Sequence, residues 1–300
     1  MDLKALYQRF RAWQRDPFPP ATPSGNTHHC LNCGNTYEGN HCPQCGQKYD
    51  VGPADWHALR DELVKIGGVK DSKSGLSFIV QLLFRPGYLI SDYISGRRGI
   101  CDPPVGMLGV IAVAAMLVEK LTVNPGTDWV QPLSEAGGLL GTILGWLSSH
   151  LNWAILIQTV LLIVPTWLLF RFSPRHTRHT LPEGIYIQVF MGSLILICVM
   201  LRALLGDWIL FLVPLYYFIA YYQLFGYGAW GTLWRTLLCL GIIFYFFGVL
   251  MAVRTRLSGD FWAGVSTGAF IAMLCLFIAL GAGILYLGYR IGKKTAKTHN

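Results

Sequence analysis

The chain has 300 residues, of which 53% are hydrophobic and only 13% are charged, about half the charged share of an ordinary soluble domain. The first hundred residues hold 12 Lys and Arg against 9 Asp and Glu, so the formal net charge of +8 does not come from a strongly basic domain. A nucleic-acid partner is therefore not expected. Charged residues become sparse after this front piece, which predicts a soluble front followed by a membrane-embedded, mostly α-helical remainder.

Residues 1–20 lack the apolar core of a signal peptide and instead predict a short amphipathic helix with its linker. Apolar residues recur there at helical spacing, with basic residues between them: Leu3, Leu6, Tyr7, Phe10 and Trp13, and Lys4, Arg9, Arg11 and Arg15. Such a helix lies on a membrane surface or packs on its own domain, and the sequence favours neither. Prolines at positions 17, 19 and 20 end it.

Residues 26–50 carry two Cys-x-x-Cys-Gly knuckles, in which a glycine permits the tight turn that aims backbone amides at the sulfurs. The four candidate metal ligands are Cys30, Cys33, Cys42 and Cys45. Four thiolates form the closed tetrahedral shell that zinc prefers, so the pattern predicts a zinc ribbon with one zinc ion. Two disulfides would need an oxidising compartment, a redox pair would explain only one knuckle, and an iron–sulfur cluster is the weaker metal alternative.

A closed shell leaves the zinc no open position for water or substrate, which makes its role structural. The segment is too short to bury a useful core, so metal binding supplies its folding energy. Lys48 is its only Lys or Arg. The segment is therefore expected to recognise a protein partner or to dock on the membrane part of the chain.

Residues 54–103 are predicted to form cytoplasmic or interfacial amphipathic helices. An apolar stripe within 76–84 is broken at Arg85-Pro86-Gly87, and a second short helix follows at 88–95. The pattern indicates a two-part helix along the cytoplasmic membrane surface, with arginines at anionic lipid headgroups.

Residues 104–292 are predicted to hold six transmembrane helices, because about 20 apolar residues cross a bilayer as a helix. The candidates are 104–122, 152–171, 184–205, 208–226, 233–253 and 264–289. The segment 137–149 is too short to span and predicts an interfacial or re-entrant helix. Basic loops and the basic tail 293–300 place both termini in the cytoplasm.

Three motifs occur in order along the chain: "CLNCG", "CPQCGQ" and "RPGYLISDYISGRR". On these motifs the chain resembles, over about residues 28–230, a family of bacterial inner-membrane proteins catalogued as a domain of unknown function. The resemblance implies zinc and a bacterial inner membrane, and it supplies no reaction. The sequence departs from the family at a Glu-His pair that opens a middle span, because Glu183 is followed here by Gly184.

Intramembrane charges are the usual candidates for function, but the charged residues of the predicted spans all lie near span ends. No Walker loop is present. The leading hypothesis is a non-enzymatic docking and assembly module, with self-association or a membrane or cytoplasmic protein as partner. The alternatives are an oligomeric channel and lipid or small-molecule handling in a cytoplasmic-side crevice lined by Arg85, Asp92, Arg97, Arg98 and Glu183.

Overall fold

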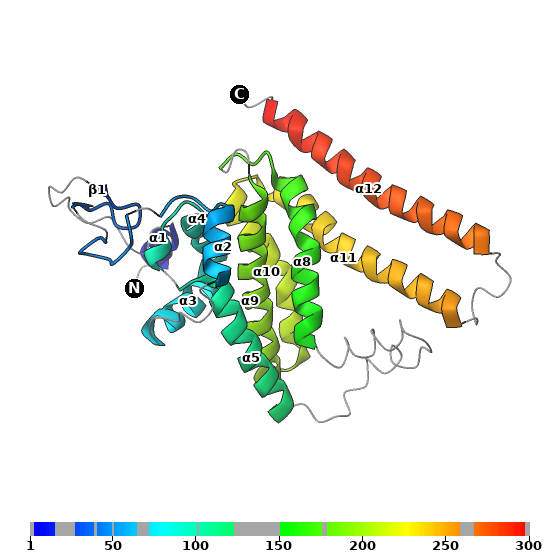
Figure 1. Cartoon of the computed structure of the whole chain (residues 1–300), viewed down its shortest axis with the longest axis horizontal. Coiled ribbons are helices and arrows are strands. Elements are labelled where there is room, and N and C mark those ends of the chain that lie inside the picture. The colour runs from blue at the N-terminus through cyan, green and yellow to red at the C-terminus, as the bar shows by residue number, and fades with distance from the viewer. Residues whose placement is uncertain are drawn as a thin grey trace.

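The computed structural model describes residues 3–15, 28–38, 41–49, 51–64, 72–100, 102–122, 151–175, 179–258 and 267–297. This part of the chain is mostly helical, as predicted, and its one sheet has two short strands. The cysteine-rich front and the short helices lie at one side of a bundle of long helices (Figure 1). The predicted helix at 137–149 falls outside the described residues.

The cysteine module, as we call residues 28–38 and 41–49, has little regular structure. Strand β1 (His28–His29) pairs antiparallel with β2 (Thr36–Tyr37), and a single bridge joins His41 to Lys48. Its buried cluster consists mainly of the cysteines and Tyr37. So small a core does not hold a fold on its own, which agrees with a module that depends on metal.

Four short helices connect the module to the bundle: α1 (Leu3–Arg15), α2 (Trp56–Val64), α3 (Ser72–Phe84) and α4 (Pro86–Ile94), and a turn of 3₁₀ helix, η1 (Arg98–Ile100), follows. The break predicted at 85–87 is present. However, α4 does not lie exposed on a membrane surface, because six of its nine residues are buried. It packs against α9 and α10, so this part of the predicted surface helix belongs to the core.

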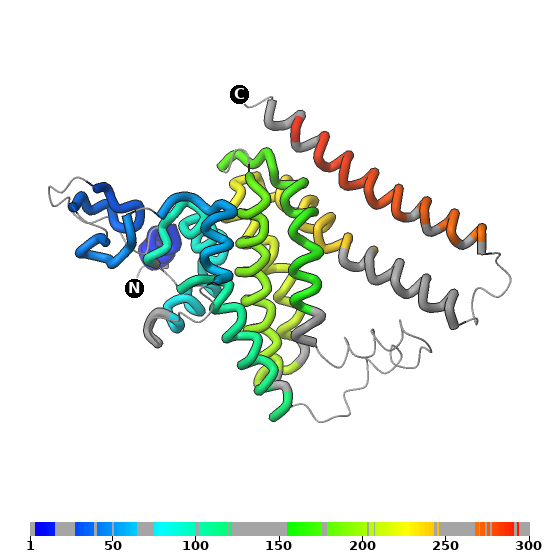
Figure 2. Tube along the Cα trace, in the orientation of Figure 1, coloured from blue at the N-terminus to red at the C-terminus, as the bar shows by residue number. Residues whose placement is uncertain are grey.

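The bundle consists of α5 (Pro104–Thr122), α8 (Leu151–Phe170), α9 (Leu181–Leu205), the 3₁₀ segment η3 (Asp207–Phe211) and α10 (Leu212–Phe225). Helix α9 is central and packs against α5 and α8, while α10 lies against α4. Two longer helices follow, α11 (Ala229–Ser258) and α12 (Thr267–Lys297), and they run away from the bundle as a hairpin (Figure 2). Residues 293–297 of the predicted tail therefore continue α12.

Three helical segments are long and apolar enough to cross a membrane: Leu181–Arg202, Trp208–Phe225 and Ile271–Arg290. Two further apolar stretches in the predicted spans are shorter, Pro104–Val118 and Ile155–Phe170. The first of the three long segments is mostly buried by its neighbours, whereas the third is almost wholly exposed. The described helices are thus compatible with a membrane protein, with α9 at the centre of the bundle and α12 at its edge.

One polar cluster lies inside the bundle, where α8, α9 and α10 meet. The Gln188 Nε2 donates to Thr166 Oγ1 at 2.8 Å and to the Tyr221 hydroxyl at 3.0 Å, and the last two groups are 2.9 Å apart. All three side chains are fully buried. In lipid, such shared hydrogen bonds select one packing of apolar helices over others.

Candidate metal centre and its mounting on the membrane helices

The four predicted metal ligands come together in space. The sulfurs of Cys30, Cys33, Cys42 and Cys45 all lie within 4.8 Å of one another, and two pairs, Cys30–Cys45 and Cys33–Cys42, are 3.5 Å apart. A tetrahedral ion with Zn–S bonds of about 2.3 Å holds its sulfurs about 3.8 Å apart. A disulfide needs about 2.05 Å. The geometry therefore fits one metal ion and is consistent with zinc.

The two knuckles have the same local structure, which explains the spacing of the motif. In each, the glycine N–H donates to the carbonyl of the first cysteine, Gly34 to Cys30 at 2.9 Å and Gly46 to Cys42 at 2.8 Å. Both glycines have positive φ, 76° and 73°. Residues other than glycine rarely adopt a positive φ, so Gly is required where the chain turns tightly beside the four sulfurs.

The electrostatics of the cluster suit metal capture. Burial acts to raise the pKa of the Cys42 thiol, but the backbone N–H groups of Cys45 and Gln44 outweigh it and lower that pKa to about 6. Burial raises the pKa of Cys33 to about 12. One thiolate is therefore present at neutral pH, and an incoming metal must displace protons from other thiols, so binding releases protons.

Gln47, which follows the second knuckle, fastens the module to the membrane part. Its Oε1 accepts from the N–H groups of Arg98 and Gly99, both at 2.9 Å, and its Nε2 donates to the Gly96 carbonyl at 2.9 Å. Gln47 is buried. We call residues 96–99 the clamp turn, because one side chain supplies hydrogen-bond partners to three of its four residues.

The clamp turn also fits closely against the first knuckle. A Cβ on Gly99 would lie 2.6 Å from the Asn32 side chain, and one on Gly96 would lie 3.1 Å from Leu31, with φ at +99°. Arg97 Nε donates to the Asn32 carbonyl at 3.3 Å. The two glycines and Arg97 of this turn are therefore explained by contact with the cysteine module, whereas the Arg98 guanidinium donates to the Pro53 carbonyl outside it.

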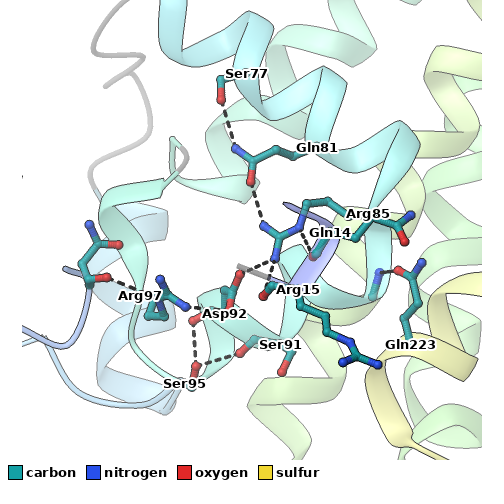
Figure 3. Close-up of polar contacts among 12 residues, drawn as sticks. Gln14, Arg15, Ser77, Gln81, Arg85, Ser91, Asp92, Ser95, Arg97 and Gln223 are labelled. Carbon is teal, nitrogen blue, oxygen red and sulfur yellow. Dashed lines mark hydrogen bonds and ion pairs between the residues drawn. The ribbon is translucent and has the colours of Figure 1, made fainter. Parts of the chain in front are cut away.

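Arg85 is a second fixed point, and it is completely buried (Figure 3). Its guanidinium donates to Asp92 Oδ2 at 2.7 Å and to Gln81 Oε1 at 2.9 Å. It also donates to the backbone carbonyls of Gln14 and Arg15, the last residues of α1. One side chain thus joins α1, α3 and α4, as suits a fork of five donors.

Gly87 and Gln223 attach α4 to the bundle. The Gly87 N–H donates to Gln223 Oε1 at 3.0 Å. A Cβ on Gly87 would overlap the Ala220 carbonyl oxygen and lie 2.8 Å from the Leu224 nitrogen. Each residue of Arg85-Pro86-Gly87 therefore has a packing reason, with Pro86 in the first turn of α4.

Glu62 of α2 holds the start of α5. Its carboxylate accepts from the Val105 N–H at 2.8 Å and from the Tyr93 hydroxyl at 3.0 Å. Burial raises the pKa of this carboxyl, against the Val105 hydrogen bond, which lowers it. A carboxylate at a helix N-terminus is favoured by the helix dipole. Glu62, Gln47 and Gln223 were not predicted from the sequence, because each side chain accepts hydrogen bonds from backbone N–H groups far away in the chain.

The predicted crevice residues do not form one site. Asp92 contacts both Arg85 and Arg97, the latter at 3.5 Å, so these three come together as predicted. The Arg98 guanidinium instead lies 5.3 Å above the Tyr93 ring. Glu183 belongs to another cluster at the start of α9.

The Glu183 carboxylate lies beside the imidazole of His179. Its Oε2 lies 2.9 Å from His179 Nδ1 and accepts from the Thr180 N–H at 3.0 Å. A Cβ on Gly184 would lie 3.8 Å from His179 Nε2. The imidazole comes from one turn before Glu183, not from the following position.

Comparison with known proteins adds no family or relative: neither a family model, nor a curated protein, nor a solved structure matches the chain.

Proposed function

We propose that this chain is a six-span protein of the bacterial inner membrane whose zinc ribbon serves as a cytoplasmic docking and assembly module, without enzymatic activity. The observation that carries the proposal is the Gln47 clamp. Through it the metal centre is attached to the clamp turn, and the clamp turn continues directly from α4, which is buried in the bundle. A partner held by the ribbon would be fixed rigidly to the membrane helices.

Six spans are supported by a helix at each of the six predicted segments. Large apolar side chains on these helices are exposed outside the bundle, as lipid contact requires. They include Val113 and Leu117 on α5, Val160 and Val164 on α8, and Ile278 and Leu280 on α12. The basic segments 171–175 and 290–297 then lie on the side of the cysteine module, which supports a cytoplasmic location for both termini.

The surface for a protein partner is provided by exposed aromatic side chains on and beside the module. Tyr49 is 49% exposed and its ring lies 4.8 Å from that of His28. Trp56, at the start of α2, is 56% exposed. Tyrosine and tryptophan are the residues that contribute most at protein interfaces.

The geometry does not favour lipid handling at Arg85. This guanidinium is fully buried, and its donors are occupied by Asp92, Gln81 and the end of α1. A lipid phosphate would have to displace Asp92 from the buried guanidinium, and Asp92 would be left with its longer, 3.5 Å contact to Arg97.

Native mass spectrometry of the protein extracted gently from its membrane tests the proposal. The wild type is expected as a metal-loaded oligomer or as a complex with a second protein. Trp56→Ala and Tyr49→Ala together are expected to retain the metal and to lose the assembly. The matched control is Trp208→Ala on η3, whose side chain is 55% exposed and lies outside the module. A wild-type monomer, or equal loss in the control, would refute the docking role.

A further inference from the structure

Contacts that hold helix α1 to the rest of the protein lie near its C-terminal end, and its apolar side is exposed. Every residue from Lys4 to Ala12 is exposed. Leu6, Tyr7 and Phe10 are 48%, 58% and 40% exposed, although they share one side of the helix. The sequence left two arrangements open for this helix, packing on its own domain or lying on a membrane surface. Packing of its apolar side on its own domain is not observed.

The C-terminal end of α1 is nevertheless fixed in place. Gln14 Nε2 donates to the Phe84 carbonyl at 2.6 Å, and the buried Arg85 donates to the carbonyls of Gln14 and Arg15. These contacts set the direction in which α1 leaves α3. Because the guanidinium sits at the negative end of the helix dipole, it stabilises that helix end.

That direction lies across the bundle. Figure 2 shows α1 end-on, while α5, α8, α9, α11 and α12 run lengthwise in the page. Helix α1 therefore runs across the direction of α5, α8 and α9 (Figure 2). A helix that lies flat on a bilayer crossed by those helices has this orientation.

The helix to which α1 is attached, α3, also carries an exposed apolar stripe. Leu76, Val80 and Phe84 of α3 recur every four residues, and they are 65%, 37% and 53% exposed. On its inner side, Phe78 stacks on Phe190 of the central helix α9 with ring centroids 5.7 Å apart. Helix α3 thus lies against a membrane span and turns an apolar stripe outward.

The charge of α1 identifies what covers it. Residues 3–15 contain four basic residues, Lys4, Arg9, Arg11 and Arg15, and no acidic ones. We propose that α1 lies flat on the cytoplasmic leaflet as an anionic-lipid-binding helix, with its apolar side at the acyl boundary and its arginines on lipid phosphates. The bilayer is always within reach, because α3 attaches α1 to a spanning bundle, so a weak surface affinity is enough.

Hydrogen exchange of the full-length protein in lipid nanodiscs tests this assignment. Two bilayers are compared, phosphatidylcholine alone and phosphatidylcholine with added phosphatidylglycerol. Amides of residues 4–12 are expected to exchange several-fold more slowly in the anionic bilayer. Arg9→Glu is expected to make these amides exchange about fivefold faster in the anionic bilayer, because one basic residue contributes about that factor at an anionic surface.

Arg60→Glu is the matched control, because Arg60 is exposed on α2 and lies outside α1. It should leave exchange in residues 4–12 unchanged. Equal exchange in the two bilayers, or no effect of Arg9→Glu, overturns the proposal. Protection that persists in lipid-free detergent would show that α1 packs on the protein itself, and it would also overturn the proposal. The result is independent of the docking role, since metal content and assembly are measured separately on the same samples.

Discussion

The front of the molecule and its membrane bundle hold their segments together by different means. At the front, single side chains satisfy the backbone of distant segments, as Gln47 does at the clamp turn and Arg85 does at the end of α1. In the bundle, most backbone groups are bonded within their own helix, and the helices meet through apolar packing with buried polar contacts at Gln188 and Arg235. Irregular turns need outside partners for their buried N–H and C=O groups, whereas helices do not.

This difference has a consequence for mutation. At the front, removing one side chain leaves several buried backbone groups without partners, so the cost is high. In the bundle, losing a hydrogen bond leaves helices that remain internally bonded, so the cost is low. Five substitutions, in order of decreasing expected effect, test this difference between the two regions.

Cys42→Ser is expected to abolish metal binding and to unfold the cysteine module. Structural zinc contributes about 10–16 kcal/mol of apparent binding free energy to small domains, far more than this module's buried cluster contributes. Metal analysis together with limited proteolysis of residues 28–49 provides the measurement. Cys275→Ser, at an exposed cysteine of α12, is the control and should behave as wild type. Full metal content in Cys42→Ser would show that the four-sulfur site is not the metal centre.

Arg85→Met is expected to lower the free energy of unfolding by about 3–5 kcal/mol, because it removes the buried cation that contacts Asp92 at 2.7 Å and leaves Asp92 with the longer contact to Arg97. Thermal unfolding in detergent, followed by tryptophan fluorescence, measures the effect. Arg85→Met combined with Asp92→Leu should recover part of the loss, since the Arg85–Asp92 ion pair is then removed as a whole. If the double variant is as unstable as the sum of both singles, the pair is not coupled.

Gly87→Ala is expected to cost about 1–3 kcal/mol, because the added Cβ overlaps the backbone of α10 at Ala220. The same unfolding assay applies. Gly106→Ala is the matched control, since a Cβ on that helical glycine of α5 meets nothing within 4 Å. A Gly87→Ala protein as stable as the control would mean that α4 can move away from α10 at no cost.

Gln47→Ala is expected to destabilise the junction by about 1–3 kcal/mol, because the Arg98 and Gly99 N–H groups lose their acceptor. Metal should remain bound, since the four sulfurs are untouched. Hydrogen exchange at residues 96–99 should accelerate while exchange within the knuckles stays slow. Unchanged exchange at the clamp turn would remove the basis for a rigid attachment.

Gln188→Leu is expected to have the smallest effect, about 0.6 kcal/mol for each hydrogen bond lost between membrane helices. Leucine keeps an apolar side chain of similar size between α8 and α10. The unfolding assay used for Arg85→Met provides the comparison. A loss as large as that of Arg85→Met would show that polar contacts determine stability in both regions alike.

Much of the local structure followed from local residue patterns. The knuckles, the helix break at 85–87 and the existence of the long helices were predictable, because each depends on neighbours within a few residues. The boundaries were less so, since α11 and α12 end five and eight residues beyond the predicted spans. The grouping of Arg85 with Asp92 also followed, since both lie on one short segment. Their burial did not, because a helix such as α4 with a modest apolar stripe looks the same on a membrane surface as in a core.

The sequence by itself determined the metal ligands, the glycines that shape the knuckles and the helices of the membrane part. Only the tertiary structure decided where those pieces meet. Gln47 lies about fifty residues from the clamp turn, and Gln223 lies 136 residues from Gly87. Hydrogen bonds at such separations leave no periodic trace in the sequence. They form because folding brings unsatisfied backbone groups beside whichever polar side chain can reach them.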